Sequence, residues 1–133
     1  MARLILIEDD HALRDCIALS LRAAGHEVTL ASDGATGTEL ARLFPVDLLI
    51  TDLVMPGQEA METIRILRKE HPQLPIVAIS GDSPHSELYL DIARKIGADA
   101  ALAKPFTLEE LHTTIRRLLE ASPPRPPSPA PAA

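Results

Sequence analysis

Residues 46–57 read VDLLITDLVMPG, an apolar run that reaches an aspartate and then a Pro-Gly turn. Four of the first six residues are large and apolar, which is typical of a strand that is buried on both faces. The aspartate, Asp52, comes where the chain must leave the core. Its position becomes intelligible when the ends of the other apolar runs are compared with it.

The composition indicates a single soluble globular domain. The chain has 133 residues, of which 46% are hydrophobic and 24% charged, and its net charge is −6. Lys and Arg never form a run longer than two residues, which argues against nucleic-acid binding. No apolar run approaches the ~20 residues that a membrane span needs. Cys16 is the only cysteine, so we expect a cytoplasmic protein without an internal disulfide, and Cys16 itself as a small core residue.

The composition changes sharply at residue 122. The segment SPPRPPSPAPAA (122–133) holds half of the prolines and cannot build a packed core. We therefore predict a folded domain over residues 1–121 and a Pro-rich disordered tail, or the start of a linker, over 122–133. A PxxP ligand within the tail is a second interpretation. The chain is then either a stand-alone protein or the front of a longer one.

Within residues 1–121, short apolar runs alternate with segments of helical periodicity. The runs are Leu4–Ile7, Val28–Leu30, Val46–Ile50, Ile76–Ile79 and Ala100–Ala103. The last helical segment has Leu108, Leu111, Ile115 and Leu118 on one face, and it opens with a capping box of Thr107 and Glu110. Five strands that alternate with five helices predict a parallel sheet covered on both faces, a doubly wound α/β fold.

Polar residues follow these strands at the end where such sheets bind ligands. They are Glu8, Asp9 and Asp10 after the first strand, Asp52 after the third, Ser80 after the fourth and Lys104 after the fifth. Taken singly, each has an ordinary structural role: Asp10 as a helix cap, Ser80 in a turn, Lys104 at the surface. Their coincidence at four strand ends instead predicts a shared site.

Clustered carboxylates require a compensating cation. Two of them ~4 Å apart repel by roughly 4 kcal/mol at an effective dielectric constant of about 20. Lys104 supplies one positive charge, and an all-oxygen site with open positions suits Mg²⁺.

The motifs LILIEDD, ITDLVMP, AIS and AKPF, in this order, resemble the receiver domains of two-component response regulators. The resemblance covers residues 2–121. It is to the single-domain, chemotaxis-like type of receiver. It implies a flavodoxin-like (βα)5 fold with strand order 2-1-3-4-5. It also implies a cis peptide bond between Lys104 and Pro105.

The resemblance assigns a role to each matched residue. Asp52 is the phosphoryl acceptor, and Glu8 and Asp9 hold Mg²⁺ together with Asp52. The backbone carbonyl of Val54 is the remaining protein ligand. Ser80 is the switch hydroxyl that binds the phosphoryl group, and Lys104 is its ion-pair partner.

The implied function is phosphoryl transfer from a sensor histidine kinase, or from a phosphotransfer protein, to Asp52. The domain would signal by conformational switching to an unknown downstream protein, without binding nucleic acid or membrane, and would be a signalling module that assists its own phosphorylation and dephosphorylation rather than an enzyme. Two alternatives remain: a degenerate receiver that acts by protein binding alone, and a Mg²⁺-dependent phosphohydrolase. The complete acid set argues against the first. Val54, where the second class has another aspartate, argues against the second.

Three positions depart from the family pattern. Ala101 stands where receivers usually have an aromatic residue that rotates inward on activation, and Ala60 replaces a common glycine. The apolar Val54 cannot orient a water molecule, which suggests slow self-dephosphorylation. The segment SGDSPHS (80–86) suggests a longer loop after the fourth strand. We therefore expect activation to perturb residues around 80–90 strongly and residues 107–120 weakly.

Overall fold

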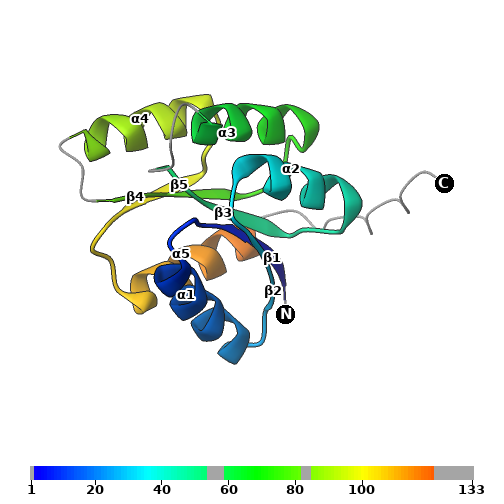
Figure 1. The fold of residues 1–133 in the computed structure, drawn as a ribbon, viewed down its shortest axis with the longest axis vertical. Coiled ribbons are helices and arrows are strands. Elements are labelled where there is room, and N and C mark those ends of the chain that lie inside the picture. Colours follow the sequence, from blue (N-terminus) through cyan, green and yellow to red (C-terminus); the bar gives the residue numbers. More distant parts are fainter. Residues whose placement is uncertain (1, 54–58, 82–84, 122–133) are drawn as a thin grey trace.

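The computed structural model describes residues 2–53, 59–81 and 85–121. Strands and helices alternate along the chain (Figure 1). The strands are β1 (Arg3–Ile7), β2 (Glu27–Ala31), β3 (Leu48–Asp52), β4 (Ile76–Ser80) and β5 (Ala100–Ala103). The helices are α1 (His11–Ala23), α2 (Gly34–Leu43), α3 (Glu59–Glu70), α4 (Ser86–Ile96) and α5 (Leu108–Ala121). The tail, 122–133, lies outside the described residues.

All strand pairs are parallel, and the sheet order is β2-β1-β3-β4-β5, as expected. The apolar run around residue 48 predicted its strand two residues too early, because β3 extends over Leu48–Asp52 instead of Val46–Ile50. Asp52 is therefore the last residue of the strand rather than the first residue after it, and it is paired with Ile79 of β4.

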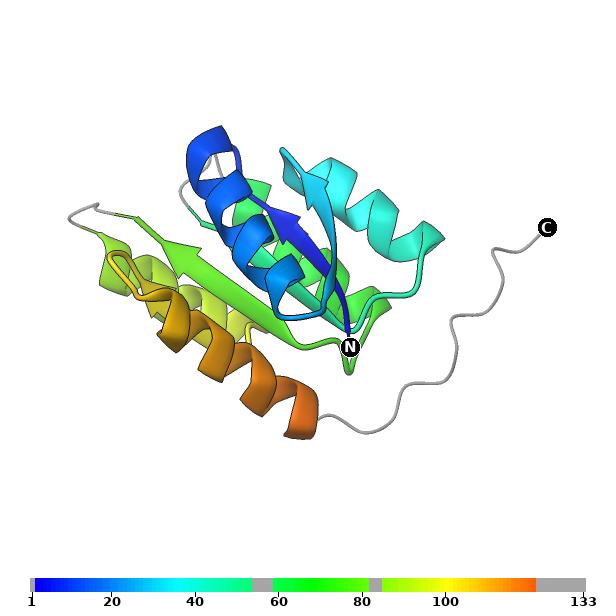
Figure 2. The same ribbon diagram turned by 90° about the horizontal axis from the view of Figure 1, so that it is seen from below.

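Helices cover both faces of the sheet. The helices α2, α3 and α4 lie on one face and α1 and α5 on the other (Figures 1 and 2). Alternate side chains of β1 enter different cores: Ile5 and Ile7 pack toward α2–α4, and Leu4 and Leu6 toward α1 and α5. This two-sided burial explains why the central strands are apolar at nearly every position.

Helix α2 packs closely on its neighbours because it has glycine at two contact points. A Cβ atom on Gly34 would lie 1.9 Å from Thr63 Oγ1 of α3, and one on Gly37 would lie 2.3 Å from Cδ1 of Ile7. These contacts leave no room for a larger side chain. They hold the end of β1, and therefore the residues that follow it, against the rest of the sheet.

The helix ends agree with several predicted signals. The Asp10 side chain accepts hydrogen bonds from the backbone N–H groups of Ala12 and Leu13, so it caps α1. In addition, α4 ends at Gly97, whose positive φ of 141° favours glycine. Thr107 Oγ1 accepts a hydrogen bond from the N–H of Glu110, one half of the predicted capping box.

Two expectations about side chains were wrong. Cys16 is exposed, because it lies on the outer side of α1 next to the buried Ile17. Leu108, at the first position of α5, is 40% exposed, whereas Leu111 and Ile115 carry the buried face. Hydrophobic periodicity alone did not distinguish the exposed Leu108 from the buried Leu111 and Ile115.

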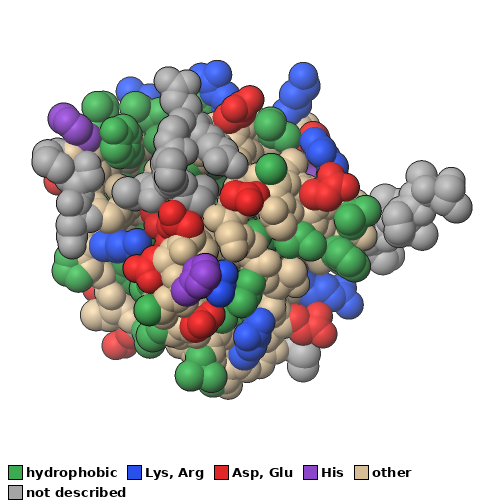
Figure 3. Space-filling view, in the orientation of Figure 1, with side chains coloured by type: hydrophobic (Ala, Val, Ile, Leu, Met, Phe, Trp, Pro, Cys, Tyr) green, Lys and Arg blue, Asp and Glu red, His purple; other side chains and the backbone are tan. Residues whose placement is uncertain are grey.

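On the face seen in Figure 3, Lys and Arg side chains are scattered among acidic ones rather than gathered in a patch. None of the helices within residues 2–53, 59–81 and 85–121 combines the length and hydrophobicity of a membrane-spanning segment.

Candidate functional site

The predicted polar residues lie at the carboxyl edge of the sheet. Glu8 directly follows β1, Asp52 ends β3, Ser80 ends β4, and Lys104 directly follows β5. The backbone N–H of Lys104 donates to the carbonyl of Ser80 over 2.8 Å, which holds the ends of β4 and β5 together. The predicted convergence of residues from four strand ends is therefore present in the fold.

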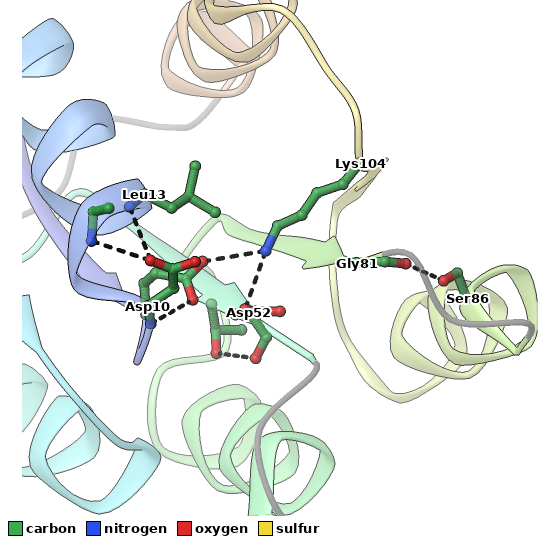
Figure 4. Close-up of polar contacts among 9 residues, drawn as sticks. Asp10, Leu13, Asp52, Gly81, Ser86 and Lys104 are labelled. Carbon is green, nitrogen blue, oxygen red and sulfur yellow. Dashed lines mark hydrogen bonds and ion pairs between the residues drawn. The ribbon is translucent and has the colours of Figure 1, made fainter.

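An ammonium group lies between two buried carboxylates. Lys104 Nζ is 3.3 Å from Asp52 Oδ2 and 3.5 Å from Glu8 Oε1. Figure 4 shows the lysine reaching down from the loop after β5, with its nitrogen pointing to the end of β3. The side chains of Glu8 and Asp52 are only 1% and 3% exposed, so little water screens this contact. The peptide bond between Lys104 and Pro105 is cis, as expected.

Glu8 is held in an unfavourable environment for a carboxylate. Burial first, and then the neighbouring Asp52 carboxylate, together raise its pKa to about 8, against smaller lowering effects of the Asp10 N–H and of Lys104. The N–H of Asp10 donates to Glu8 Oε2 over 3.2 Å. Glu8 Oε1 accepts no hydrogen bond from any described residue, although the lysine nitrogen is close to it.

A third carboxylate completes the group. Ligand atoms of Glu8, Asp9 and Asp52 all lie within 4.8 Å of one another, and Asp9 is exposed while the other two are buried. Asp10 does not join them, because its side chain caps α1. The prediction that Asp10 serves as a helix cap is therefore confirmed.

These three carboxylates fit a hard divalent cation. They supply only oxygen donors, and a single lysine opposes the negative charge that they carry when ionised. The buried oxygen of Glu8 without a hydrogen bond is one place where a cation would compensate the charge. The predicted fourth protein ligand, the carbonyl of Val54, lies outside the described residues.

Ser80 presents a hydroxyl group at the same edge. Its residue is fully buried, at 0% exposure, and its Oγ has no hydrogen-bond partner among the described residues. A buried hydroxyl in this state costs roughly 1–3 kcal/mol. A buried polar group without a partner calls for an explanation, such as a catalytic role or a bound water or ion.

Two further features surround the site. Ala101 is partly buried and packs against the core on the α2–α4 side, so a small side chain fills the position of the usual aromatic residue. Ser86, the first residue of α4, donates a hydrogen bond from its Oγ to the carbonyl of Gly81 (Figure 4). Apart from the presence of Ser86 in the segment SGDSPHS, no sequence pattern predicts this contact.

Comparisons with known proteins agree with this geometry. The family model described as the response regulator receiver domain matches residues 4–116. The chain is 36% identical over 122 residues to the response regulator MprA of Mycobacterium leprae (strain TN), covering 92% of this chain and 53% of that protein. It is 34% identical over 125 residues to a probable transcriptional regulatory protein of a Picosynechococcus strain, covering 89% of this chain and 49% of that protein.

A solved structure of a response regulator receiver domain protein from Clostridium thermocellum superimposes with a TM-score of 0.81. The sequences are 26% identical, and the match covers 90% of this chain and 95% of that one. The chain spans about half the length of the curated relatives that it matches.

Proposed function

Because the chain belongs to the response regulator receiver domain family of two-component systems, we propose that Asp52 accepts a phosphoryl group from a phosphohistidine. The donor is a sensor histidine kinase or a phosphotransfer protein. The observation that carries the proposal is the buried Asp52 carboxylate with Lys104 Nζ at 3.3 Å, at the end of a central strand.

The transfer replaces one bond by another. An oxygen of the Asp52 carboxylate attacks the phosphorus, the P–N bond of the phosphohistidine breaks, and its electron pair returns to the imidazole ring. The product is an acyl phosphate on Asp52. Lys104 lies where it can balance the negative charge that gathers around the acceptor, and it is held there by its backbone bond to Ser80.

Glu8, Asp9 and Asp52 are the residues that would hold Mg²⁺. When bound, Mg²⁺ neutralises charge on the phosphoryl oxygens and on the acid cluster. The raised pKa of Glu8 supports this assignment, because a cation would restore the ionised form that burial and Asp52 disfavour. The carbonyl of Val54 is the fourth protein ligand in the same proposal.

In this proposal, the Ser80 hydroxyl responds to phosphorylation of Asp52 by binding the phosphoryl group. Its buried hydroxyl has no partner in the described part of the chain, and a phosphoryl group on the neighbouring strand end provides acceptor oxygens. The movement of Ser80 toward that group shifts the populations of two conformations of the segment that follows β4.

The proposal extends to the wider biological setting. Residues 1–121 form the receiver, and residues 122–133 form a tail or the start of a linker. The chain receives its signal in the cytoplasm and passes it to a downstream protein. The complete set of acid, lysine and hydroxyl groups supports phosphorylation over a degenerate receiver that only binds proteins.

A direct experiment is incubation with acetyl phosphate and Mg²⁺, followed by intact-mass measurement. The wild-type chain should gain one phosphoryl group, and Asp52→Asn should gain none. Asp15→Asn, a change at an exposed acid of α1, is the matched control and should be labelled like the wild type. Asp9→Asn should fold normally but bind Mg²⁺ about tenfold more weakly and be labelled more slowly. Labelling of Asp52→Asn, or unchanged Mg²⁺ affinity in Asp9→Asn, would contradict the respective assignment.

A further inference from the structure

Asp10 connects the residues that follow β1 to the start of α1, although it is not one of the three clustered carboxylates. Its backbone N–H donates to Glu8 Oε2 over 3.2 Å. Its side-chain Oδ1 accepts the N–H groups of Ala12 and Leu13 over 3.1 and 3.2 Å, and its carbonyl accepts the N–H of Arg14 over 2.8 Å. Figure 4 shows the Asp10 side chain beside Leu13 at the start of the helix. One residue thus holds a candidate ligand side chain and the first turn of α1 together.

The turn between β1 and α1 is short and is anchored at both ends. At the strand end, the N–H of Glu8 donates to the carbonyl of Ala31 in β2 over 3.1 Å. At the helix end, the anchor is Asp10 with its hydrogen bonds to α1. Asp9, the exposed member of the carboxylate cluster, lies between these two anchors. Its position relative to Glu8 and Asp52 therefore depends on how firmly Asp10 is held.

Packing holds the first turn of α1 only weakly. None of the residues 11–14 is fully buried, and the buried side chains of the helix begin at Ile17. The carboxylate of Asp10 satisfies two backbone N–H groups that have no partner within the helix. The cap is therefore a main contact that fixes this turn, and with it the residues that precede the helix.

The carboxylate cluster needs such support before a cation binds. Its three carboxylates, with ligand atoms within 4.8 Å of one another, repel when they are ionised. Lys104 forms ion pairs with Glu8 and Asp52, whereas Asp9 forms none within the part of the chain that the structure describes. A turn that was free to relax would move Asp9 outward, and the cation would then have to gather its ligands at a cost in affinity.

We propose that Asp10 is a positioning residue that pre-organises Glu8 and Asp9 for Mg²⁺ through its cap on α1. The inference rests on the proposed function, which assigns Mg²⁺ to this cluster, and it gives Asp10 a role in metal affinity without making it a ligand. The apparent affinity of a site falls with the fraction of molecules in which the site is assembled. A cap of ordinary strength changes such a ratio about fivefold, so loss of the cap should weaken Mg²⁺ binding by about that factor.

Uncharged variants of Asp10 separate the cap from the charge. Asp10→Asn and Asp10→Ser keep a side-chain oxygen that can cap α1, whereas Asp10→Ala keeps none. In calorimetric titrations with magnesium chloride, Asp10→Ala should bind Mg²⁺ about fivefold more weakly than Asp10→Asn, and Asp10→Ser should bind it like Asp10→Asn. Labelling with acetyl phosphate should show the same shift in the half-saturating Mg²⁺ concentration. The maximal labelling rate should be the same in all three variants, because bound Mg²⁺ holds the turn in place.

Asp33 provides the matched control, because it caps α2 in the same way. Its Oδ1 accepts the N–H of Thr36 over 2.7 Å. Asp33→Ala should be less stable toward urea than Asp33→Asn, as Asp10→Ala is expected to be less stable than Asp10→Asn. The two Asp33 variants should nevertheless bind Mg²⁺ with equal affinity. A difference between them as large as that between the Asp10 variants would show that loss of any cap weakens binding, and would overturn the inference.

The remaining outcomes separate the inference from the proposed function. If Asp10→Ala and Asp10→Asn bind Mg²⁺ equally, the cap does not position the ligands and the inference fails. If the maximal labelling rate falls in Asp10→Ala while the half-saturating Mg²⁺ concentration is unchanged, Asp10 acts on the chemistry rather than on the metal, and the inference also fails. If Mg²⁺ binding depends on the cap as expected but the wild type takes no phosphoryl group, the positioning role stands and the proposed phosphorylation is wrong.

Discussion

The two ends of the sheet differ in how their polar groups are paired. At the amino ends of β4 and β5, Arg68 donates to the carbonyls of Gly97 and Pro72 and to the Asp99 carboxylate, over 2.6–2.9 Å. Asp99 in turn accepts the N–H of Ile76. At the carboxyl ends, Glu8 and Ser80 each keep a buried oxygen without a hydrogen bond from the described residues.

The difference shows which polar groups serve the fold and which serve the site. A satisfied network at the amino edge joins the ends of α3 and α4 to the starts of two strands, which stabilises the native state. Groups at the carboxyl edge without a hydrogen bond cost stability, and in the proposed function they gain partners, a cation for Glu8 and a phosphoryl group for Ser80. Substitutions at the two edges should therefore change stability in opposite directions.

The largest expected effect is at the amino edge. Arg68→Ala should lower the free energy of unfolding by about 2–3 kcal/mol, because it removes the hydrogen bonds to the carbonyls of Gly97 and Pro72 and one of the two donors to the Asp99 carboxylate. Urea unfolding measures the change, and the exposed Arg65 of the same helix provides the control, Arg65→Ala. Labelling with acetyl phosphate should persist in the variant. A loss of labelling without a change in stability would contradict the assignment of Arg68 to the fold rather than to the site.

The next effect is at Glu8, and it depends on pH. The pKa of Glu8 is raised from 4.5 to about 8, so the folded state binds its proton more tightly than the unfolded state. Its contribution to stability is complete below pH 4.5 and declines as the pH rises toward 8. In the presence of a chelator, Glu8→Gln should therefore match the wild type near pH 4.5 and be more stable above pH 8.

The difference above pH 8 should reach at least about 1.4 kcal/mol, the free energy of a tenfold change in a protonation equilibrium. Urea unfolding in chelator at several pH values measures it. Glu62→Gln, at an exposed position of α3, should show no such pH dependence. Addition of Mg²⁺ should stabilise the wild type and not Glu8→Gln. A variant that is less stable than the wild type at high pH would show that the Glu8 carboxylate is well accommodated.

The smallest effect is expected for the tail. Deletion of residues 122–133 removes no apolar position of the α5 periodicity, so the free energy of unfolding should change by less than ~0.5 kcal/mol. Thermal unfolding of the shortened chain measures it, with labelling as a second readout. A drop of several degrees in Tm would mean that the tail packs on the domain and that a third region contributes to stability.

Sequence patterns predicted the fold because each pattern reflects a local constraint. Continuous apolar runs identified the central strands, and the residues at four strand ends identified the candidate site. The carboxyl end of β3 was misplaced because Thr51 and Asp52 are polar although they pair with neighbouring strands, Asp52 on the β4 side. Local periodicity does not report such pairing.

The contacts that distinguish the two edges could not be predicted. Arg68 and Gly97 are 29 residues apart, and nothing in their local sequence indicates that one binds the other. The raised pKa of Glu8 arises from burial and from the proximity of Asp52, which both depend on the packed sheet. The contact between Ser86 and Gly81 likewise could not be predicted from the local sequence.

The central claim is that Asp52 is the phosphoryl acceptor, and chemical trapping tests it most directly. Borohydride reduces an acyl phosphate to an alcohol, so it would convert a phosphorylated aspartate to homoserine. After labelling with acetyl phosphate and Mg²⁺, peptide mass analysis should find homoserine at position 52 and unmodified side chains at Glu8 and Asp9. Reduction at Glu8 or Asp9 with Asp52 unchanged would contradict the account.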